Sequence, residues 1–372
     1  MERASRRLVA GSTGHYCWEL LAGRGIIAVT ISTTPVVQEI RAAVQEIPAI
    51  RVSFPQHRIT PQRQQRWRLW SRSFFLALFI LAPVFNLLRY DLSAGHAVIL
   101  GMDWRLGIDD FSAGQISASQ LGMNILLRLF VPLVGGAVLF LAVARRWGRI
   151  YCGWLCPHFS VVETINYWMR RASGRPSLWE KKPLPAKNPD GSPFHSDPRW
   201  WWITLPLAIV FALVWAVVLL TYLLPPAEIY SHLWHGTLTR NQTLFITVAT
   251  VLLSLEFLFA RHLFCRFGCA IGLFQSLAWM TNRDGLVVGF ARNRAADCSA
   301  CYRSSGMGIA ACEAVCPMRL KPRSPKNGMF TCTQCVQCVA ACTTVQGEGN
   351  SLLTWVTQES ARQQEARVGL LG

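Results

Sequence analysis

Eight of the chain's thirteen cysteines lie within residues 297–346. Four of them form a CxxCxxCxxxC run and four precede it, in the order Cys298, Cys301, Cys312, Cys316, Cys332, Cys335, Cys338 and Cys342. Short loops of this kind let several thiolates converge on one iron–sulfur cubane, with backbone amides turned toward its sulfides. The residue types and their spacing therefore predict two [4Fe-4S] clusters.

The fourth cysteine of such a run usually ligates the neighbouring cluster. This crossing assigns Cys298, Cys301, Cys312 and Cys342 to one cluster, and Cys332, Cys335, Cys338 and Cys316 to the other. The first set is irregular, because Ser304 stands where a regular run would place its third cysteine. Cys312 keeps the regular spacing to Cys316, so we expect Cys312 to be the third ligand.

The bulk composition indicates that the chain carrying these thiols is a membrane protein. The chain of 372 residues is 52% hydrophobic and only 15% charged, with a mean hydropathy of +0.28, which is too apolar for an ordinary soluble enzyme. Four apolar runs are candidate membrane spans: residues 73–88, 129–144, 200–227 and 241–260.

The distribution of basic residues predicts the topology. Of the 37 lysines and arginines, 11 lie in residues 1–72, 10 in 145–199 and 12 in 261–372, whereas 89–121 and 225–240 carry 2 and 1. This alternation follows the positive-inside rule for four spans with both termini cytoplasmic, in a bacterial inner membrane. The net charge of +17 thus reflects the orientation of the chain in the membrane. No nucleic-acid partner is expected.

Cytoplasmic placement limits what the cysteines can form. Thiols are kept reduced there, so a disulfide framework is disfavoured and metal binding is favoured. Zinc sites with four cysteine ligands are common but come as separated CxxC pairs, so the packed run favours iron and sulfide. Cys17 stands alone near the N-terminus and reads as a free thiol.

An internal repeat contains the remaining four cysteines. "RIYCGWLCPHFSVVETINYWMRR" follows the second span and "RHLFCRFGCAIGLFQSLAWMTNR" follows the fourth. Within a helix, Cys152 and Cys156 would share one face, as would Cys265 and Cys269. Pseudo-symmetry would bring all four to the cytoplasmic membrane border. Two interpretations then have equal weight: the four thiols bind a metal or act in redox chemistry, or they are buried and inert.

The predicted fold class is a mainly α membrane protein. Four transmembrane helices form two repeated hairpins, and a small α+β, two-cluster ferredoxin-like domain follows on the cytoplasmic side. The expected domains are an unassigned N-terminal cytoplasmic segment (1–66), a membrane domain with both CxxxC repeats (67–282), the ferredoxin-like domain (283–346) and a C-terminal tail (347–372).

These motifs resemble those of the membrane-bound polyferredoxins with paired CxxxCP motifs. That family includes the quinol-oxidising ferredoxin of periplasmic nitrate reductase systems, the membrane regulator of nitrous oxide reduction and the accessory ferredoxin of cbb3 oxidase assembly. The resemblance rests on "GRIYCGWLCP", "FCRFGCAIG", "CEAVCP" and "CTQCVQC", and Ala270 departs from it by replacing the proline of the second CxxxCP. It implies a membrane core that passes electrons between the quinone pool and a partner redox complex.

Two functions from different classes follow. The leading hypothesis is an electron-transfer protein or quinol-linked oxidoreductase subunit, because eight cysteines in ferredoxin spacing follow a repeated membrane hairpin. No nucleotide-binding loop or nucleophile motif appears in the sequence. The alternative is a copper reductase or maturation factor for a metalloenzyme, because the soft CxxxC thiolates suit Cu(I). Glu256 interrupts the fourth span and is a candidate proton acceptor from quinol, or a paired acid at a helix end. Glu163 carries the same two interpretations.

Overall fold

The chain folds into two compact units, Met1–Gln56 and His57–Gly372. The computed structural model describes residues 60–175, 178–179, 183–298, 301, 309–324 and 329–369, together with three short strands of the first unit. Those strands, β1 (Arg6–Ala10), β2 (Tyr16–Leu21) and β3 (Ile26–Thr30), form an antiparallel sheet in the order β1-β2-β3. Cys17 lies in β2. The sequence had assigned no structure to this segment.

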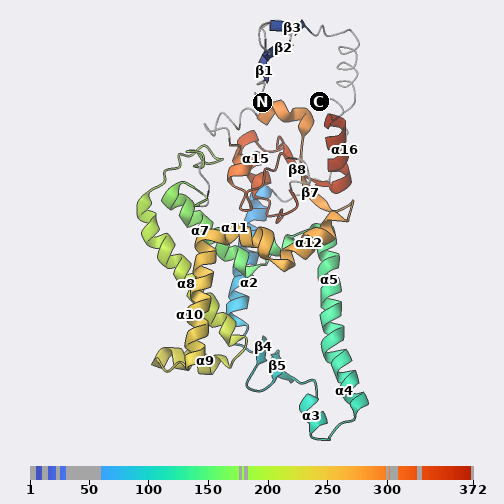
Figure 1. Ribbon diagram of the computed structural model, residues 1–372, viewed down its shortest axis with the longest axis vertical. Coiled ribbons are helices and arrows are strands. Elements are labelled where there is room, and N and C mark those ends of the chain that lie inside the picture. Colours follow the sequence, from blue (N-terminus) through green and yellow to red (C-terminus); the bar gives the residue numbers. More distant parts are fainter. Residues whose placement is uncertain are drawn as a thin grey trace. The chain divides into compact units, whose positions relative to one another are not determined.

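The second unit is mainly helical (Figure 1). Three of its helices have the length and apolar composition that a membrane crossing requires, which is compatible with membrane insertion. The first, Ala118–Trp147, joins α4 (Ala118–Ile125), the π-helix η1 (Leu126–Phe130) and α5 (Val131–Trp147); the second is Pro198–Thr221, made of η2 (Pro198–Trp200) and α8 (Trp201–Thr221); the third is Arg240–Gly268, made of α10 (Arg240–Leu255), η3 (Glu256–Ala260), α11 (Arg261–Leu263) and η4 (Phe264–Gly268).

The predicted span at 73–88 belongs to a fourth helix, α2 (Pro61–Leu81). Thr60 caps its N-terminus by accepting a hydrogen bond from the Arg63 amide, and a proline occupies its first turn. α2 ends at Leu81, seven residues before the predicted end, because the chain then turns into a small antiparallel sheet. That sheet comprises β4 (Leu88–Asp91), β5 (His96–Ile99) and β6 (Met102–Trp104), and it is followed by α3 (Ile108–Ser112).

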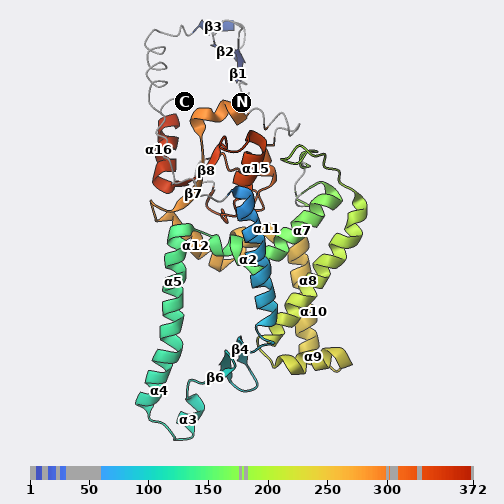
Figure 2. The same ribbon diagram turned by 180° about the vertical axis from the view of Figure 1, so that it is seen from behind.

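The helices do not pair as two simple hairpins. α8 packs against α10, to which it is joined by α9 (Pro226–His235), so the second predicted hairpin is present. α2 instead packs against α7 (Pro157–Ser173). Its Leu76 and Phe79 pack on a buried cluster that includes Trp215 of α8, and the ring of Phe79 contacts that of Trp215. α5 packs against α12 (Ala270–Met280), which belongs to the other repeat (Figures 1 and 2). The apolar window of the α4–α5 helix is nowhere buried within the protein.

α7 and α12 lie across the ends of the long helices (Figures 1 and 2). α7 follows the first CxxxC pair and α12 the second, so the sequence repeat corresponds to a repeat in structure. α7 is held by a buried apolar cluster in which Val161 and Ile165 contact Ala208, Ala212 and Phe257. Burial of this kind contributes roughly 25 cal/mol per Å² of apolar surface, so it fixes the CxxxC segment firmly on the long helices.

The cysteine-rich part extends beyond the predicted boundary at residue 346. β8 (Leu353–Thr357) pairs antiparallel with β7 (Leu286–Phe290), and α16 (Gln358–Gly369) packs on both strands. The segment expected to be a C-terminal tail therefore forms a strand and a helix as far as residue 369, and its strand completes a sheet with a strand that precedes all eight cysteines. η5 (Arg292–Cys298), α14 (Ala311–Ala314) and α15 (Gln337–Gln346) complete this part. The predicted boundary at residue 66 falls inside α2.

Candidate metal centres

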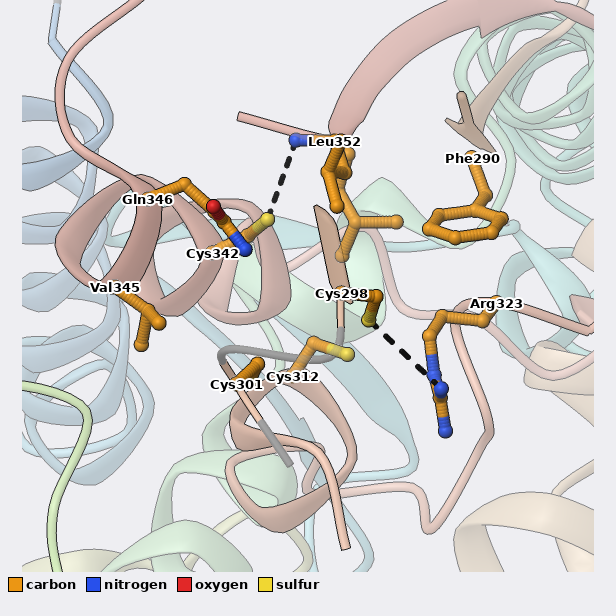
Figure 3. Close-up of a pocket in the computed structure, with 10 residues that line it drawn as sticks. Phe290, Cys298, Cys301, Cys312, Arg323, Cys342, Val345, Gln346 and Leu352 are labelled. Carbon is orange, nitrogen blue, oxygen red and sulfur yellow. Dashed lines mark hydrogen bonds between the residues drawn. The ribbon is translucent and has the colours of Figure 1, made fainter. Parts of the chain in front are cut away.

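Four cysteines line one pocket in the cysteine-rich part (Figure 3). Cys298 ends η5, Cys312 lies in α14 and Cys342 lies in α15, and Cys301 completes the group. Figure 3 shows their side chains around a common space, with Leu352 beside them. These are the four members of the first crossed set, so the structure brings together residues that are up to 44 positions apart in the chain. Their role as ligands stays a prediction.

Hydrogen-bond donors already face the sulfur atoms of this pocket, which we call pocket 1. The Ala311 amide donates to Cys301 Sγ at 3.2 Å and the Leu352 amide donates to Cys342 Sγ at 3.3 Å. The Arg323 guanidinium donates to Cys298 Sγ at 3.8 Å and is itself paired with Glu313. N–H···S bonds of this kind stabilise thiolates and tune the potential of a bound cluster. The donor set therefore fits a [4Fe-4S] cluster.

The other four cysteines line a second pocket, pocket 2. Its cysteines are Cys316, Cys332, Cys335 and Cys338, and most of its remaining lining is apolar, including Val288, Met318, Leu320 and Met329. The Leu320 amide donates to Cys316 Sγ at 3.4 Å. These are the members of the second crossed set. Cys312 in pocket 1 and Cys316 in pocket 2 belong to the same short segment, so the two pockets are neighbours.

The backbone between the ligand candidates of pocket 2 is unusual. Gln334 and Val336 adopt left-handed conformations, with φ of 52° and 64°. Side-chain-bearing residues take up such conformations at a cost, and the surrounding contacts must hold them there. Trp154 Nε1 donates to the Gln334 carbonyl at 3.1 Å, and Gln334 Nε2 donates to the Leu286 carbonyl at 3.0 Å. The resulting tight turns direct three cysteines of one run toward the same pocket.

Burial disfavours free thiolates at both pockets. It raises the pKa of Cys316 to about 11 and that of Cys332 to about 12. Burial also raises the pKa of further thiols in the two pockets: Cys298, Cys312, Cys335 and Cys338. These thiols lose their protons only when a cation such as iron compensates the charge, so cluster binding is coupled to proton release.

The turn of pocket 2 contacts α2 and both CxxxC repeats. Gln65 of α2 donates to the Cys335 carbonyl at 2.7 Å, and Ser276 of α12 donates to the Phe330 carbonyl at 2.7 Å. Gly153, between the two CxxxC cysteines, lies so close to the Thr333 carbonyl that a Cβ would overlap its oxygen. Both repeats and α2 therefore hold pocket 2, through backbone carbonyls that no sequence motif marks.

Replacing Gly153 with alanine is expected to displace this turn. The added Cβ meets backbone at Thr333, which cannot rotate away as a flexible side chain would, so we expect a destabilisation of about 1–3 kcal/mol. The measurement is the iron content and apparent melting temperature of the anaerobically purified protein, and both should fall. Gly135→Ala in α5 is the matched control, because its Cβ meets open space. Equal iron and melting temperature in the two variants would contradict the prediction.

The four CxxxC cysteines do not lie on continuous helices. Cys152 lies in α6 (Ile150–Trp154) and Cys265 in η4, whereas Cys156 and Cys269 are N-cap residues with extended backbones (ψ of 117° and 109°). The chain thus leaves the helical conformation at the second cysteine of each pair. The expected shared helix face stays a prediction. Proline at 157 favours this break, since it disfavours the α conformation of the residue before it. The second pair makes the same break with Ala270, so the missing proline does not change the local structure.

Arg149 occupies the space between these cysteines and pocket 2. Its side chain is 1% exposed, donates to Ser276 Oγ and to the Cys265 carbonyl, and lies over the ring of Phe330. Burial lowers the pKa of Arg149, and the thiols of Cys152, Cys269, Cys265 and Cys332 oppose that shift. Sequence reasoning missed this residue, although both repeats begin with a basic residue before the CxxxC. Burial also raises the pKa of Cys152 to about 12.

Glu163 and Glu256 have different partners. Glu163 of α7 forms ion pairs with Arg68 and Arg72 of α2 and accepts a hydrogen bond from Gln337 of α15. The carboxylate of Glu163 is thus a paired acid that joins three helices. Glu256 begins η3 and lies 2.9 Å from His158 Nε2, and His158 Nδ1 lies 3.7 Å from Cys265 Sγ. His158 was missed because nothing in the sequence places it beside the fourth span.

No group of three Cys, His, Asp or Glu side chains among the described residues is arranged to hold a single metal ion. A zinc or copper ion gathers its ligands around one atom, whereas a cubane takes one thiolate at each of four irons. The grouping of the cysteines in fours around pockets 1 and 2 suits the cubane.

Comparisons with known proteins also point to iron–sulfur chemistry, through the part of the chain that holds the CxxxC pairs. The chain matches a family described as "4Fe-4S binding domain" over residues 128–176 and 241–284, which contain both CxxxC pairs. It is also similar to two uncharacterized proteins of Methanocaldococcus jannaschii, MJ0750 and MJ0749. The first is 26% identical over 56% of this chain and 75% of its own length, and the second is 24% identical over 62% and 73%. No solved structure matches the chain. The family match supports an iron–sulfur protein with a role in electron transfer.

Proposed function

We propose that this protein is a polyferredoxin-type electron carrier of the bacterial inner membrane. It holds two [4Fe-4S] clusters and passes electrons between the quinone pool, or a cytoplasmic donor, and a partner redox complex. The observation that carries the proposal is the division of eight cysteines, four and four, between two neighbouring pockets in the crossed order. That order is typical of two-cluster ferredoxins.

The bound clusters would supply one-electron transfer at potentials that the protein sets. Cys298, Cys301, Cys312 and Cys342 would hold one cluster and Cys316, Cys332, Cys335 and Cys338 the other. The amides of Ala311, Leu320 and Leu352 donate to the cysteine sulfurs, and apolar side chains exclude water from both pockets. These residues fix the environment of each cluster, and the chain thereby carries electrons between its partners.

The membrane arrangement proposed here has four spans, with α2 as the fourth. α2 is less apolar than the other three helices, but its second half (residues 73–81) carries no charge and its first half contacts pocket 2 through Gln65. Both termini and the cysteine-rich part then lie on the cytoplasmic side, where the basic residues are concentrated. This topology places pocket 2 at the cytoplasmic membrane border.

Quinone is the proposed membrane partner, with Glu256 as the proton acceptor. Glu256 is a carboxylate within the third apolar helix, and one of its oxygens, Oε1, is buried without a hydrogen-bond partner. Buried acids of this kind are costly and are commonly retained for function. The hydrogen bond to His158 gives an accepted proton a second site.

Glu256→Gln is expected to slow cluster reduction by quinol about 10²-fold or more, because a general base contributes about that much. Reduction by dithionite, which needs no proton acceptor, should be unchanged. The measurement is anaerobic stopped-flow absorbance with both reductants, with Glu228→Gln in the exposed helix α9 as control. Equal quinol rates for Glu256→Gln and the control would remove Glu256 from the proposal.

The proposed function itself is tested by anaerobic purification and reconstitution. Iron, acid-labile sulfide and low-temperature EPR after dithionite reduction should show [4Fe-4S] signals. A colourless, EPR-silent protein that contains zinc and no sulfide would overturn it. The copper alternative gains no support from the described residues, because no three side chains there gather around one ion.

A further inference from the structure

Four cysteines lie outside both pockets, at the start of α7 and α12: Cys152, Cys156, Cys265 and Cys269. We propose that these four cysteines, which we call the border cysteines, together hold a third [4Fe-4S] cluster next to pocket 2. The proposal extends the proposed function by one centre, and its test separates the two.

The backbone around the border cysteines is arranged for an anion. Cys156 caps the 17-residue α7 and Cys269 caps the 11-residue α12, each with an extended backbone and without a side-chain cap hydrogen bond. The first amides of a helix have no partner within the helix, and its N-terminus carries a partial positive charge. Two helix N-termini, each with a partial positive charge, thus lie at members of the border cysteines.

Two buried side-chain donors beside these thiols lack hydrogen-bond partners. Arg149 and Gln275 are each 1% exposed. Arg149 uses Nε and one terminal nitrogen on Ser276 and the Cys265 carbonyl, and its other terminal nitrogen, NH2, has no partner. Gln275 Oε1 lies 3.8 Å from Cys152 Sγ, and its Nε2 has no partner. Buried donors are almost always paired, and the sulfides of a cluster are acceptors that would pair them.

The buried positive charge of Arg149 requires a nearby anion to compensate it. In the part of the chain that the structure describes, Arg149 forms no ion pair with a carboxylate, although it is fully buried. The ionisable groups that act on it are the thiols of Cys152, Cys269, Cys265 and Cys332. Neutral thiols leave a buried cation uncompensated, which is unfavourable. A cubane with four thiolates is anionic and supplies the missing charge.

The candidate ligands among the described residues favour a cluster over a single ion at the border cysteines. A copper or zinc ion needs its ligands around one atom, and no three candidate ligands within the described ranges meet that condition. A cubane takes one thiolate at each iron, so its ligands stand farther apart. The match to a 4Fe-4S binding domain covers these cysteines and none of the eight in the two pockets.

The border cysteines adjoin pocket 2 through a continuous set of contacts. Arg149 bonds to Ser276, whose hydroxyl donates to the Phe330 carbonyl, two residues before Cys332. Gly153, between Cys152 and Cys156, touches the backbone of Thr333. An electron at the border cysteines would therefore have the pocket 2 cluster as its neighbour.

The test is the iron content of the full-length, anaerobically reconstituted protein. Three clusters give about 12 iron atoms and about 12 sulfides per chain, whereas two clusters give about 8 of each. We expect the wild type to show the higher value, and the quadruple variant C152A/C156A/C265A/C269A to retain about two thirds of it. Cys17→Ala, outside all three groups, should leave the iron count unchanged.

The outcomes separate this proposal from the proposed function. A wild type with about 8 iron atoms per chain, unchanged in the quadruple variant, overturns the third cluster and leaves the two-cluster carrier standing. Copper or zinc bound by the wild type and lost in the quadruple variant also overturns it. A protein without iron or sulfide overturns both. The wild-type count decides the matter by itself if the quadruple variant fails to fold.

Discussion

Cys316→Ala and Cys338→Ala are expected to remove the same cluster, so the double variant should contain as much iron as either single variant. Both thiols line pocket 2, although they belong to different cysteine runs. Each variant should lose about four iron atoms per chain. In contrast, Cys342→Ala combined with Cys338→Ala should lose about eight, because Cys342 lines pocket 1.

The comparison of the two double variants makes the experiment specific to the crossed order. If each run held its own cluster, Cys338 and Cys342 would share one, and the pattern of additivity would be reversed. Iron and sulfide assays on anaerobically purified protein measure the loss, and EPR of the reduced protein identifies the cluster that remains. The reversed pattern would refute the crossed assignment while leaving the cofactor type intact.

Glu163→Gln is expected to destabilise the contact between α2, α7 and the cysteine-rich part by about 3–5 kcal/mol, the range typical of a broken buried ion pair. The substitution leaves Arg68, 2% exposed, without its carboxylate, and weakens the contact to Gln337 of α15. Arg72 loses the same partner. The measurement is hydrogen exchange of the amides in residues 61–81 and 337–346, together with the apparent melting temperature in detergent.

Asp103→Asn is the matched control for Glu163→Gln. Asp103 pairs with Arg105 and with His96, but its own side chain is 53% exposed, and ion pairs of an exposed carboxylate contribute little. We expect its melting temperature and exchange to match the wild type. If Glu163→Gln behaved in the same way, the ion pairs with α2 would not hold the cysteine-rich part in place.

The cysteine pockets were predictable because their geometry is local. CxxC spacing restricts where thiols can meet, and the crossing rule then divides eight cysteines into the two groups that line the pockets. Cys312 joins pocket 1 despite the residues inserted before it, because its spacing to Cys316 sets its position. The existence of apolar helices was equally predictable from hydropathy, and three of the four expected spans meet the length and composition required.

The features that sequence reasoning missed depend on contacts between distant segments. β8 pairs with β7 from the far side of all eight cysteines, so a segment expected to be a tail became part of a sheet. Arg149 and His158 gain their surroundings only when the two CxxxC repeats meet, and Glu163 is shown to be paired only by the approach of α2. The proline after Cys156 could have predicted the break in the helix there, whereas no residue in the sequence predicts the same break at Cys269.

The interleaving of the two pockets also sets the order in which a growing chain can complete them. Pocket 2 has all its thiols once Cys338 has been synthesised. The first cysteine of pocket 1 is Cys298, but the lining of that pocket is incomplete until Cys342, Leu352 and Leu353 have been synthesised. A ribosome-bound chain therefore exposes three thiols of pocket 1 for as long as the second run is being translated. Maturation of pocket 1, whose first cysteine is made earliest, must therefore wait until the chain has been made as far as Leu353.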